Sequence, residues 1–209
     1  DLKKRGKYAC LLSHAHCWSI VAAGEDPAVL ILEDDTSITS NVAQMIRDVD
    51  ALGTFDLIFV NGRMKQYRQP LDNIAFRGEF LRVDEFHAEM SQTFDADEFN
   101  TRRFSSKALL RGAPGADGYV LSPTGARKLL RCFERFKMLV HADWLLYTLG
   151  IDPATLEAHP GGPPIARSIS RRTKGRDPMP DSWIYARFVV RHEGHQVGGT
   201  VRGGTEIGG

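Results

Sequence analysis

Apolar residues gather in blocks whose spacing alternates between helical and extended along the chain. Residues 7–23 carry apolar side chains three and four positions apart, which predicts an amphipathic helix. Unbroken apolar runs lie at 28–32, 57–60 and 118–121. Short runs rich in Val, Ile and Leu are typical of strands buried on both faces of a sheet. The pattern therefore predicts one helix followed by at least three buried strands.

Helical segments separate these strands. Thr39 or Ser40 is a candidate cap for a helix that ends at Leu52, and Gly53 follows it. Ser122 and Pro123 have the residue types of an N-cap and a first helical residue. A shorter helix is predicted over 143–149. The alternation of helix and strand predicts an α/β fold with a mainly parallel sheet and flanking helices.

Two regions lack a clear period. In the first, residues 80–83 are a candidate strand, residues 84–104 are interpreted as a variable insertion over the site, and residues 107–110 are a candidate edge strand. In the second, proline, glycine and arginine dominate from residue 153 on. We therefore predict a folded domain over 1–160 and a basic, Gly/Pro-rich tail over 161–209, with a frayed end.

The composition excludes several classes of protein. The 209 residues are 42% hydrophobic, and the net charge of +1 gives no bulk electrostatic reason to expect nucleic-acid binding. The three cysteines, an odd number without metal-ligand spacing, argue against a disulfide framework and for a reducing compartment. No apolar run reaches the length of a membrane span. These features favour a cytoplasmic protein.

Three carboxylates end the first apolar strand: Glu33, Asp34 and Asp35. Side chains alternate along a strand, so Glu33 and Asp35 are expected on one side and Asp34 on the other. Carboxylate oxygens suit Mg²⁺ or Mn²⁺, which also bind substrate phosphates. The alternative is a solvated acidic turn that caps the next helix.

Two histidines lie close together on the predicted first helix. His14 and His16 stand about 200° apart around a helix, so they cannot both face one ion. We interpret His14, with Ser13, as a structural or donor-side hydrogen-bonding pair, and His16 as solvated.

Four blocks in order resemble glycosyltransferase family 25, which includes bacterial lipooligosaccharide glycosyltransferases and collagen galactosyltransferases. The blocks read CLLSHAHCW from residue 10, LILEDD from residue 30, ADGYVLSPTGARKLL from residue 116 and HADW from residue 141. They are similar to the Ser-His helix of the family, its acidic metal segment, its Gly-Tyr strand with the following helix, and its Val-Asp-Trp segment.

The resemblance implies a GT-A-like fold and transfer of a sugar from a nucleotide-sugar donor to a hydroxyl. The expected donor is UDP-galactose, from which galactose is transferred with inversion. The expected acceptor is a cell-surface glycan such as lipooligosaccharide, or a lipid-linked glycan. The expected location is the cytoplasm, including peripheral association with the inner face of the cytoplasmic membrane. Mn²⁺ or Mg²⁺ on Glu33, Asp34 and Asp35 would stabilise the departing diphosphate.

The resemblance also assigns roles to single residues. Asp143 is the candidate catalytic base, and its alternative role is a helix cap. Arg63, two residues after Asn61 and following the second strand, is a candidate contact to phosphate or acceptor, or part of a plain turn. Gly118 and Tyr119 are candidates for the wall of the sugar pocket, with Tyr119 as plain strand core as the alternative. Asn61, Ser13 and His14 complete the set of candidate substrate-binding residues.

The start of the chain departs from the family pattern. Family members usually begin with a strand-helix-strand unit that helps to hold the nucleotide, whereas this sequence opens almost at the Ser-His helix. We therefore expect a partial, amino-terminally truncated catalytic domain over 1–160. Two alternatives stay open: a non-catalytic remnant of such an enzyme, and a Mg²⁺-dependent phosphohydrolase or phosphotransferase that uses the same acidic strand end.

Overall fold

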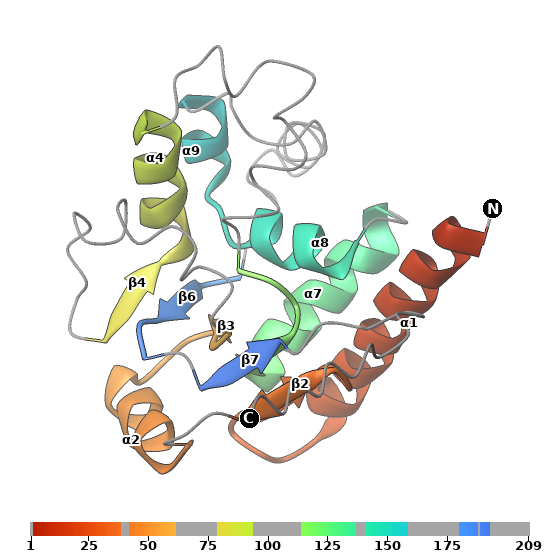
Figure 1. Cartoon of the computed structure of the whole chain (residues 1–209), viewed down its shortest axis with the longest axis horizontal. Helices are drawn as coiled ribbons and strands as arrows, with labels where there is room; N and C mark the ends of the chain where they lie inside the picture. Colours follow the sequence, from red (N-terminus) through yellow and green to blue (C-terminus); the bar gives the residue numbers. More distant parts are fainter. Residues whose placement is uncertain are drawn as a thin grey trace, which may run out of the picture.

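The computed structural model (Figure 1) describes most of the chain. The described residues are 2–38, 42–61, 79–93, 114–136, 141–158, 180–187 and 189–192. A five-stranded sheet lies at the centre, with helices packed on both of its faces, and a second sheet has two strands. The molecule is therefore a mixed α/β structure, as predicted.

The central sheet is mostly antiparallel, so the prediction of a mainly parallel sheet was wrong. Its order is β1-β5-β3-β6-β4, and only β3 and β6 pair in parallel. Strand β5 runs opposite to both β1 and β3 and separates them. The strands are β1 (Val29–Leu32), β5 (Gly118–Leu121), β3 (Leu57–Phe59), β6 (Ser182–Tyr185) and β4 (Phe80–Arg82). The predicted alternation of helices and strands is confirmed, but the alternation does not specify the order of the strands in the sheet or their directions.

Side chains of the central strands alternate between two hydrophobic layers, as the pleat of a strand requires. Tyr119 and Leu121 point into a core formed with α1 (Leu2–Ala23), α7 (Pro123–Phe136) and α8 (Ala142–Leu149). Val120 and Ile58 point into a second layer with α2 (Val42–Leu52). The predicted apolar face of the first helix is largely confirmed, because its buried residues are Leu11, His14, Ala15, Trp18 and Val21.

The start of α7 follows the predicted capping. Ser122 Oγ accepts a hydrogen bond from the backbone N–H of Gly125 at 3.0 Å, and Pro123 is the first helical residue. Gly125 lies directly on the backbone of Asp56: a Cβ there would stand 2.2 Å from the Asp56 carbonyl oxygen. Only glycine permits this approach, so α7 is fixed tightly against the entry to β3.

The regions without clear periodicity contain structure that the sequence did not reveal. Helix α4 (Val83–Thr93) buries Val83 and Phe86 in the main core, so the interpretation of residues 84–93 as an insertion was wrong. Residues 94–104 and the predicted edge strand at 107–110 lie outside the described residues.

Three further elements come from the end of the chain. Helix α9 (Pro153–Ala158) starts at a proline, and Asp152 accepts hydrogen bonds from the backbone N–H groups of Ala154 and Thr155. Strand β6 is built into the central sheet, and β7 (Val190–His192) pairs with β2 (Thr36–Ile38). The domain boundary at residue 160 stays a prediction, although both strands beyond it join sheets. In the part of the chain described, no helix combines the length and the apolarity that a membrane crossing needs.

Candidate active site

The antiparallel register of β1 and β5 brings two acidic residues together. Leu32 pairs with Gly118, so Glu33 leaves β1 beside Asp117, which enters β5. The backbone N–H of Glu33 donates to the Asp117 carbonyl oxygen at 3.0 Å and extends the ladder by one residue. Asp117 is fully buried, whereas Glu33 is partly exposed.

A third carboxylate reaches this point from the first turn of α8. Asp143 Oδ1 accepts a hydrogen bond from the backbone N–H of Ala116 at 2.6 Å. The N-cap of α8 is His141, which makes no side-chain capping bond. Asp143 thus connects its helix to the segment before β5.

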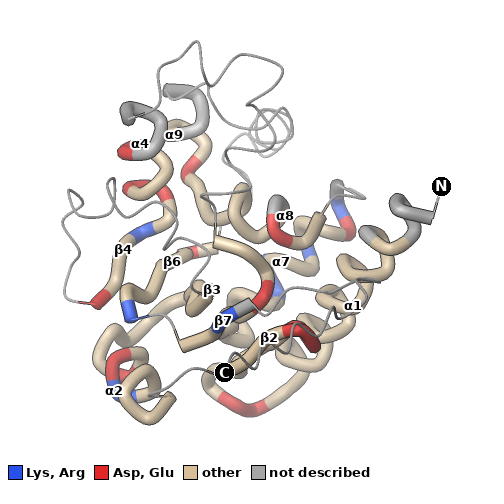
Figure 2. Tube along the Cα trace, viewed as in Figure 1, with Lys and Arg blue, Asp and Glu red and all other residues tan. Residues whose placement is uncertain are grey.

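Glu33, Asp117 and Asp143 form one group that we call the acid group. Each offers a carboxylate oxygen, and these atoms all lie within 4.8 Å of one another. Figure 2 shows acidic positions on all three segments: the turn after β1, the segment before β5 and the start of α8. Carboxylates this close repel one another unless a cation or a proton offsets their charge.

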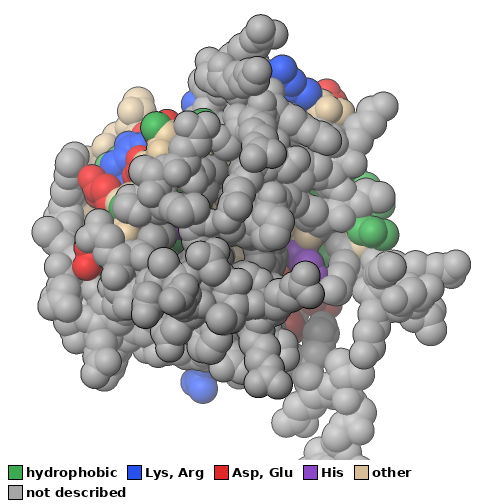
Figure 3. Space-filling view, turned by 90° about the horizontal axis from the view of Figure 1, so that it is seen from above, with side chains coloured by type: hydrophobic (Ala, Val, Ile, Leu, Met, Phe, Trp, Pro, Cys, Tyr) green, Lys and Arg blue, Asp and Glu red, His purple; other side chains and the backbone are tan. Residues whose placement is uncertain are grey.

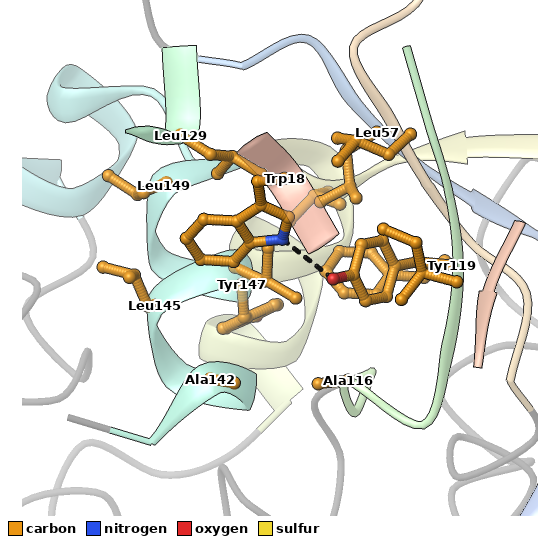
Figure 4. Close-up of a cluster of buried hydrophobic side chains, with 14 of the residues drawn as sticks. Trp18, Leu57, Ala116, Tyr119, Leu129, Ala142, Leu145, Tyr147 and Leu149 are labelled. Atoms are coloured by element: carbon orange, nitrogen blue, oxygen red, sulfur yellow. Dashed lines mark hydrogen bonds between the residues drawn. The ribbon is translucent and has the colours of Figure 1, made fainter. Parts of the chain in front are cut away.

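A chain of hydrogen bonds from the core holds Glu33. Trp18 Nε1 donates to Tyr119 Oη at 2.8 Å, Tyr119 Oη lies 2.8 Å from His14 Nδ1, and His14 Nε2 lies 3.2 Å from Glu33 Oε1. Figure 4 shows the first of these bonds inside the cluster of buried apolar side chains between α1, α8 and β5. Trp18 and Tyr119 have no exposed surface and His14 is buried, so the chain leads from the core to the site.

The protonation of this chain follows from its chemistry. Burial raises the pKa of Tyr119 far above its usual value, so the phenol keeps its proton. Because Tyr119 Oη accepts from Trp18, its own O–H is available to donate to His14 Nδ1. His14 then carries its proton on Nε2 and donates to the Glu33 carboxylate, which orients that carboxylate.

Burial and the acids of the site raise the pKa of the nearby Cys10 thiol. Its Sγ donates to Glu33 Oε1 at 3.8 Å. Burial first, and then the negative charges of Glu33, Asp143 and Asp35, raise the pKa of the Cys10 thiol to about 11. The negative charges of Glu33, Asp35 and Asp143 are therefore all felt at the Cys10 thiol, and together they favour a cation near it.

The oxygen donors of the acid group fit a hard divalent ion. Mg²⁺ and Mn²⁺ prefer carboxylate oxygens, and three such donors from separate segments converge here. Of the three predicted metal ligands, Glu33 belongs to the acid group. Asp35 is half-buried, and its charge contributes to the raised pKa of the Cys10 thiol. Asp34 is exposed. The metal assignment itself stays a prediction for all three residues.

The predicted substrate-binding residues have different surroundings. Asn61 is buried, and its Nδ2 donates to the carbonyl oxygens of Gly115 at 2.6 Å and Gly118 at 3.3 Å. It therefore positions the segment that carries Asp117. Ser13 is exposed and its Oγ donates to the Ala9 carbonyl oxygen within α1.

The glycine and the aromatic residue at the start of β5 have packing roles. Gly118 packs against Val190, and a Cβ there would stand 2.8 Å from that side chain. Tyr119 is strand core, as the alternative reading held, and also part of the hydrogen-bond chain. Arg63 lies outside the described residues. His16 is exposed, as predicted.

Sequence reasoning missed Asp117 and Cys10 as members of this neighbourhood. Asp117 precedes a strand, but only the antiparallel register with β1 places it beside Glu33. Cys10 stands four positions before His14, and this spacing puts both on one face of α1. The spacing of four residues is a signal that the sequence offers, because such residues share one face of a helix.

Fold and site together define a protein with a carboxylate-rich site at the end of a mixed sheet. The profile of glycosyltransferase family 25 (LPS biosynthesis protein) matches residues 4–146, a range that contains Cys10, His14 and the whole acid group. The chain therefore belongs to glycosyltransferase family 25. No curated protein and no solved structure matches it significantly.

Proposed function

We propose that the chain is a metal-dependent hexosyltransferase with a GT-A-like fold. It transfers a sugar, galactose in the first instance, from a nucleotide-sugar donor such as UDP-galactose to a hydroxyl of a cell-surface glycan or a lipid-linked glycan, with inversion. Membership in family 25 supports glycosyl transfer for lipopolysaccharide biosynthesis. The observation that carries the proposal is the convergence of Glu33, Asp117 and Asp143 inside the matched range.

In this proposal Glu33 and Asp117 hold the divalent cation, Mn²⁺ or Mg²⁺, and Asp35 adds negative charge close by. The bound cation would offset the charge that develops on the diphosphate leaving group. Glu33 is suited to this task because His14 fixes its carboxylate from the core. Asp117 is suited because it is fully buried, so its carboxylate is shielded from solvent.

Asp143 is proposed to take the proton of the acceptor hydroxyl. It is partly exposed, in contrast to Asp117, so an acceptor can approach it from solvent. The hydrogen bond from the Ala116 N–H holds Oδ1 and thereby sets the direction of the carboxylate. A positioned base contributes about 10²–10⁴-fold to a rate.

The test is sugar transfer from UDP-galactose to a lipooligosaccharide acceptor with Mn²⁺ present, compared between the wild-type chain and Asp143→Asn. We expect kcat to fall by about 10²–10⁴ while the protein stays folded, because asparagine keeps the shape but cannot take a proton. Asp152→Asn, at an exposed helix start, is the matched control and should keep wild-type activity. Wild-type kcat in Asp143→Asn would rule out the assigned base.

A screen of donors completes the test. Nucleotide release from UDP-sugars is measured against phosphate release from phosphoesters. Release from UDP-sugars alone supports glycosyl transfer. Release from phosphoesters alone would contradict the proposal and favour a phosphohydrolase, and no turnover of either with no Mn²⁺-dependent UDP binding would favour a non-catalytic remnant.

A further inference from the structure

Three potential metal ligands of mixed chemistry face one another beside the acid group. They are Cys10 Sγ, His14 Nε2 and Glu33 Oε1, and all three atoms lie within 4.8 Å of one another. The Sγ to Oε1 distance is 3.8 Å and the Nε2 to Oε1 distance is 3.2 Å. Tetrahedral zinc with ordinary bond lengths gives corresponding edges of about 3.6 Å and about 3.4 Å. The side chains already stand close to the spacing of a zinc site.

The positions of these donors are set by regular structure. Cys10 and His14 are four residues apart on α1, a helix of 22 residues, so they lie on one face one turn apart. Glu33 comes from the turn after β1, which is tied to Asp117 by a backbone hydrogen bond. The site therefore needs no rearrangement of the backbone to bring three ligands together.

Tyr119 supplies the support that a ligating histidine needs. A histidine that binds metal through Nε2 carries its proton on Nδ1, and that N–H requires an acceptor. When a metal takes Nε2, His14 adopts the tautomer with its proton on Nδ1, the reverse of the metal-free arrangement, and Tyr119 Oη, 2.8 Å away and fixed by Trp18 in the core, accepts from it. The outer partner that orients a zinc-bound imidazole is thus present and buried.

We propose that Cys10, His14 and Glu33 form a binding site for a borderline-soft divalent cation of the Zn²⁺ class. A thiolate, an imidazole and a carboxylate select zinc over Mg²⁺ or Mn²⁺, which prefer oxygen donors only. The thiol proton leaves to solvent when the metal binds. The acid group uses the same Glu33, so zinc at this site lowers the affinity of the acid group for the hard cation. This last consequence rests on the proposed function, whereas zinc binding itself does not.

Co²⁺ serves as the spectroscopic probe for the site. A thiolate ligand gives Co²⁺ a charge-transfer absorption band in the near ultraviolet, and we expect this band in the wild-type chain and its loss when Zn²⁺ displaces Co²⁺. Cys10→Ser should lack the band. Cys17→Ser is the matched control, because Cys17 lies on the same helix outside the ligand group, and it should keep the band. No band in the wild type, or an equal band in Cys10→Ser, would overturn the proposal.

A measurement on the wild type alone guards against misfolding of a variant. Cys10 is exposed, so iodoacetamide can reach it; the reaction is run at alkaline pH, because the raised pKa of the thiol leaves little thiolate near neutral pH, and mass spectrometry reports the rate for this one residue. One equivalent of Zn²⁺ should abolish most of the modification of Cys10 and leave that of Cys17 unchanged, because a metal-bound thiolate is no longer free to attack the reagent. Equal rates with and without Zn²⁺ would contradict the site.

Competition between the two cations separates this inference from the proposed function. Mn²⁺ binding is titrated before and after one equivalent of Zn²⁺, and the Mn²⁺ affinity should fall at least about tenfold. An unchanged Mn²⁺ affinity would show that Glu33 is not shared. No Mn²⁺ binding at all would contradict the proposed function, and the Co²⁺ band would still decide the zinc site.

Discussion

Two charged regions at different places on the central sheet are built in different ways. Around β3, β4 and β6, carboxylates face cationic side chains: Asp56 lies 2.5 Å from Lys128 Nζ, and Asp84 and Asp181 lie 3.0 and 2.9 Å from Arg82 nitrogens. We call this set the paired region. At the ends of β1 and β5, Glu33 instead faces a histidine and a thiol, and stands among further carboxylates.

In the view of Figure 3, acidic and basic side chains lie close together at the left, and a histidine side chain is visible right of centre. The pKa of the Arg82 guanidinium is raised, chiefly by its hydrogen bond to Asp84, and that of the Cys10 thiol is raised by burial and by surrounding acids. Ion pairs of opposite charge offset each other within the fold. Acids gathered around a thiol leave an excess of negative charge, which favours binding of a cation. On the proposed function, this difference separates acids that stabilise the fold from acids that bind the cation.

The largest effect on stability is expected at Asp56 in the paired region. Its Oδ2 accepts from Lys128 Nζ and from the Asp181 backbone N–H at 2.6 Å, and the residue is buried. Asp56→Ala leaves both donors without this partner and should lower the free energy of unfolding by about 3–5 kcal/mol. Urea unfolding measures the change.

The control for that variant is Asp50→Ala, an exposed position on α2 that should change stability by less than about 0.5 kcal/mol. The transfer rate per folded molecule should stay at the wild-type value in Asp56→Ala. A large loss of kcat in the folded variant would break the distinction between the two regions.

A tyrosine in each region allows a matched comparison. Tyr119→Phe removes the partner of buried Trp18 Nε1 and His14 Nδ1, and should cost about 1–3 kcal/mol of unfolding free energy. It should also lower kcat, because His14 then no longer holds Glu33 firmly. Tyr185→Phe loses a bond to Asp48, which solvent can replace, so about 1 kcal/mol and an unchanged kcat are expected. Equal effects of the two variants on kcat would argue against the hydrogen-bond chain.

The smallest effect is expected at Arg82. Its guanidinium lies over the Trp183 ring at 5.3 Å and pairs with Asp181, but both charged side chains are about one-third exposed, at 34% and 38%. Arg82→Ala should therefore cost no more than about 1 kcal/mol, and less at high salt. Unfolding at two ionic strengths tests this, and a loss above about 2 kcal/mol independent of salt would be inconsistent with a surface pair.

The elements were predictable where the local pattern was strong. The spacing on α1, the apolar runs of β1, β3 and β5, and the Ser122 cap of α7 are all confirmed. Strand direction was not predictable, because βα alternation is compatible with β5 entering between β1 and β3 from the opposite direction. Strand β6 was missed because it is short and follows a stretch rich in Pro, Gly and Arg.

The sequence also predicted part of the candidate site and missed the rest. Glu33 and Asp143 stood out as acids at a strand end and a helix start, and the structure brings them together. The role of Asp117 could not be predicted from the sequence, because only its pairing with β1 across the sheet places it beside Glu33. Cation and substrate assignments depend on such pairings between distant segments, which local patterns do not encode.

The central claim is that the acid group binds a divalent cation that the paired region does not bind. The most direct measurement is a calorimetric titration of Mn²⁺, with UDP present, into the wild-type chain, Glu33→Gln and Asp84→Asn. The account predicts Mn²⁺ binding in the wild type and in Asp84→Asn, and a loss of at least about tenfold in affinity in Glu33→Gln. Equal affinity in Glu33→Gln, or no binding to the wild type, would contradict it.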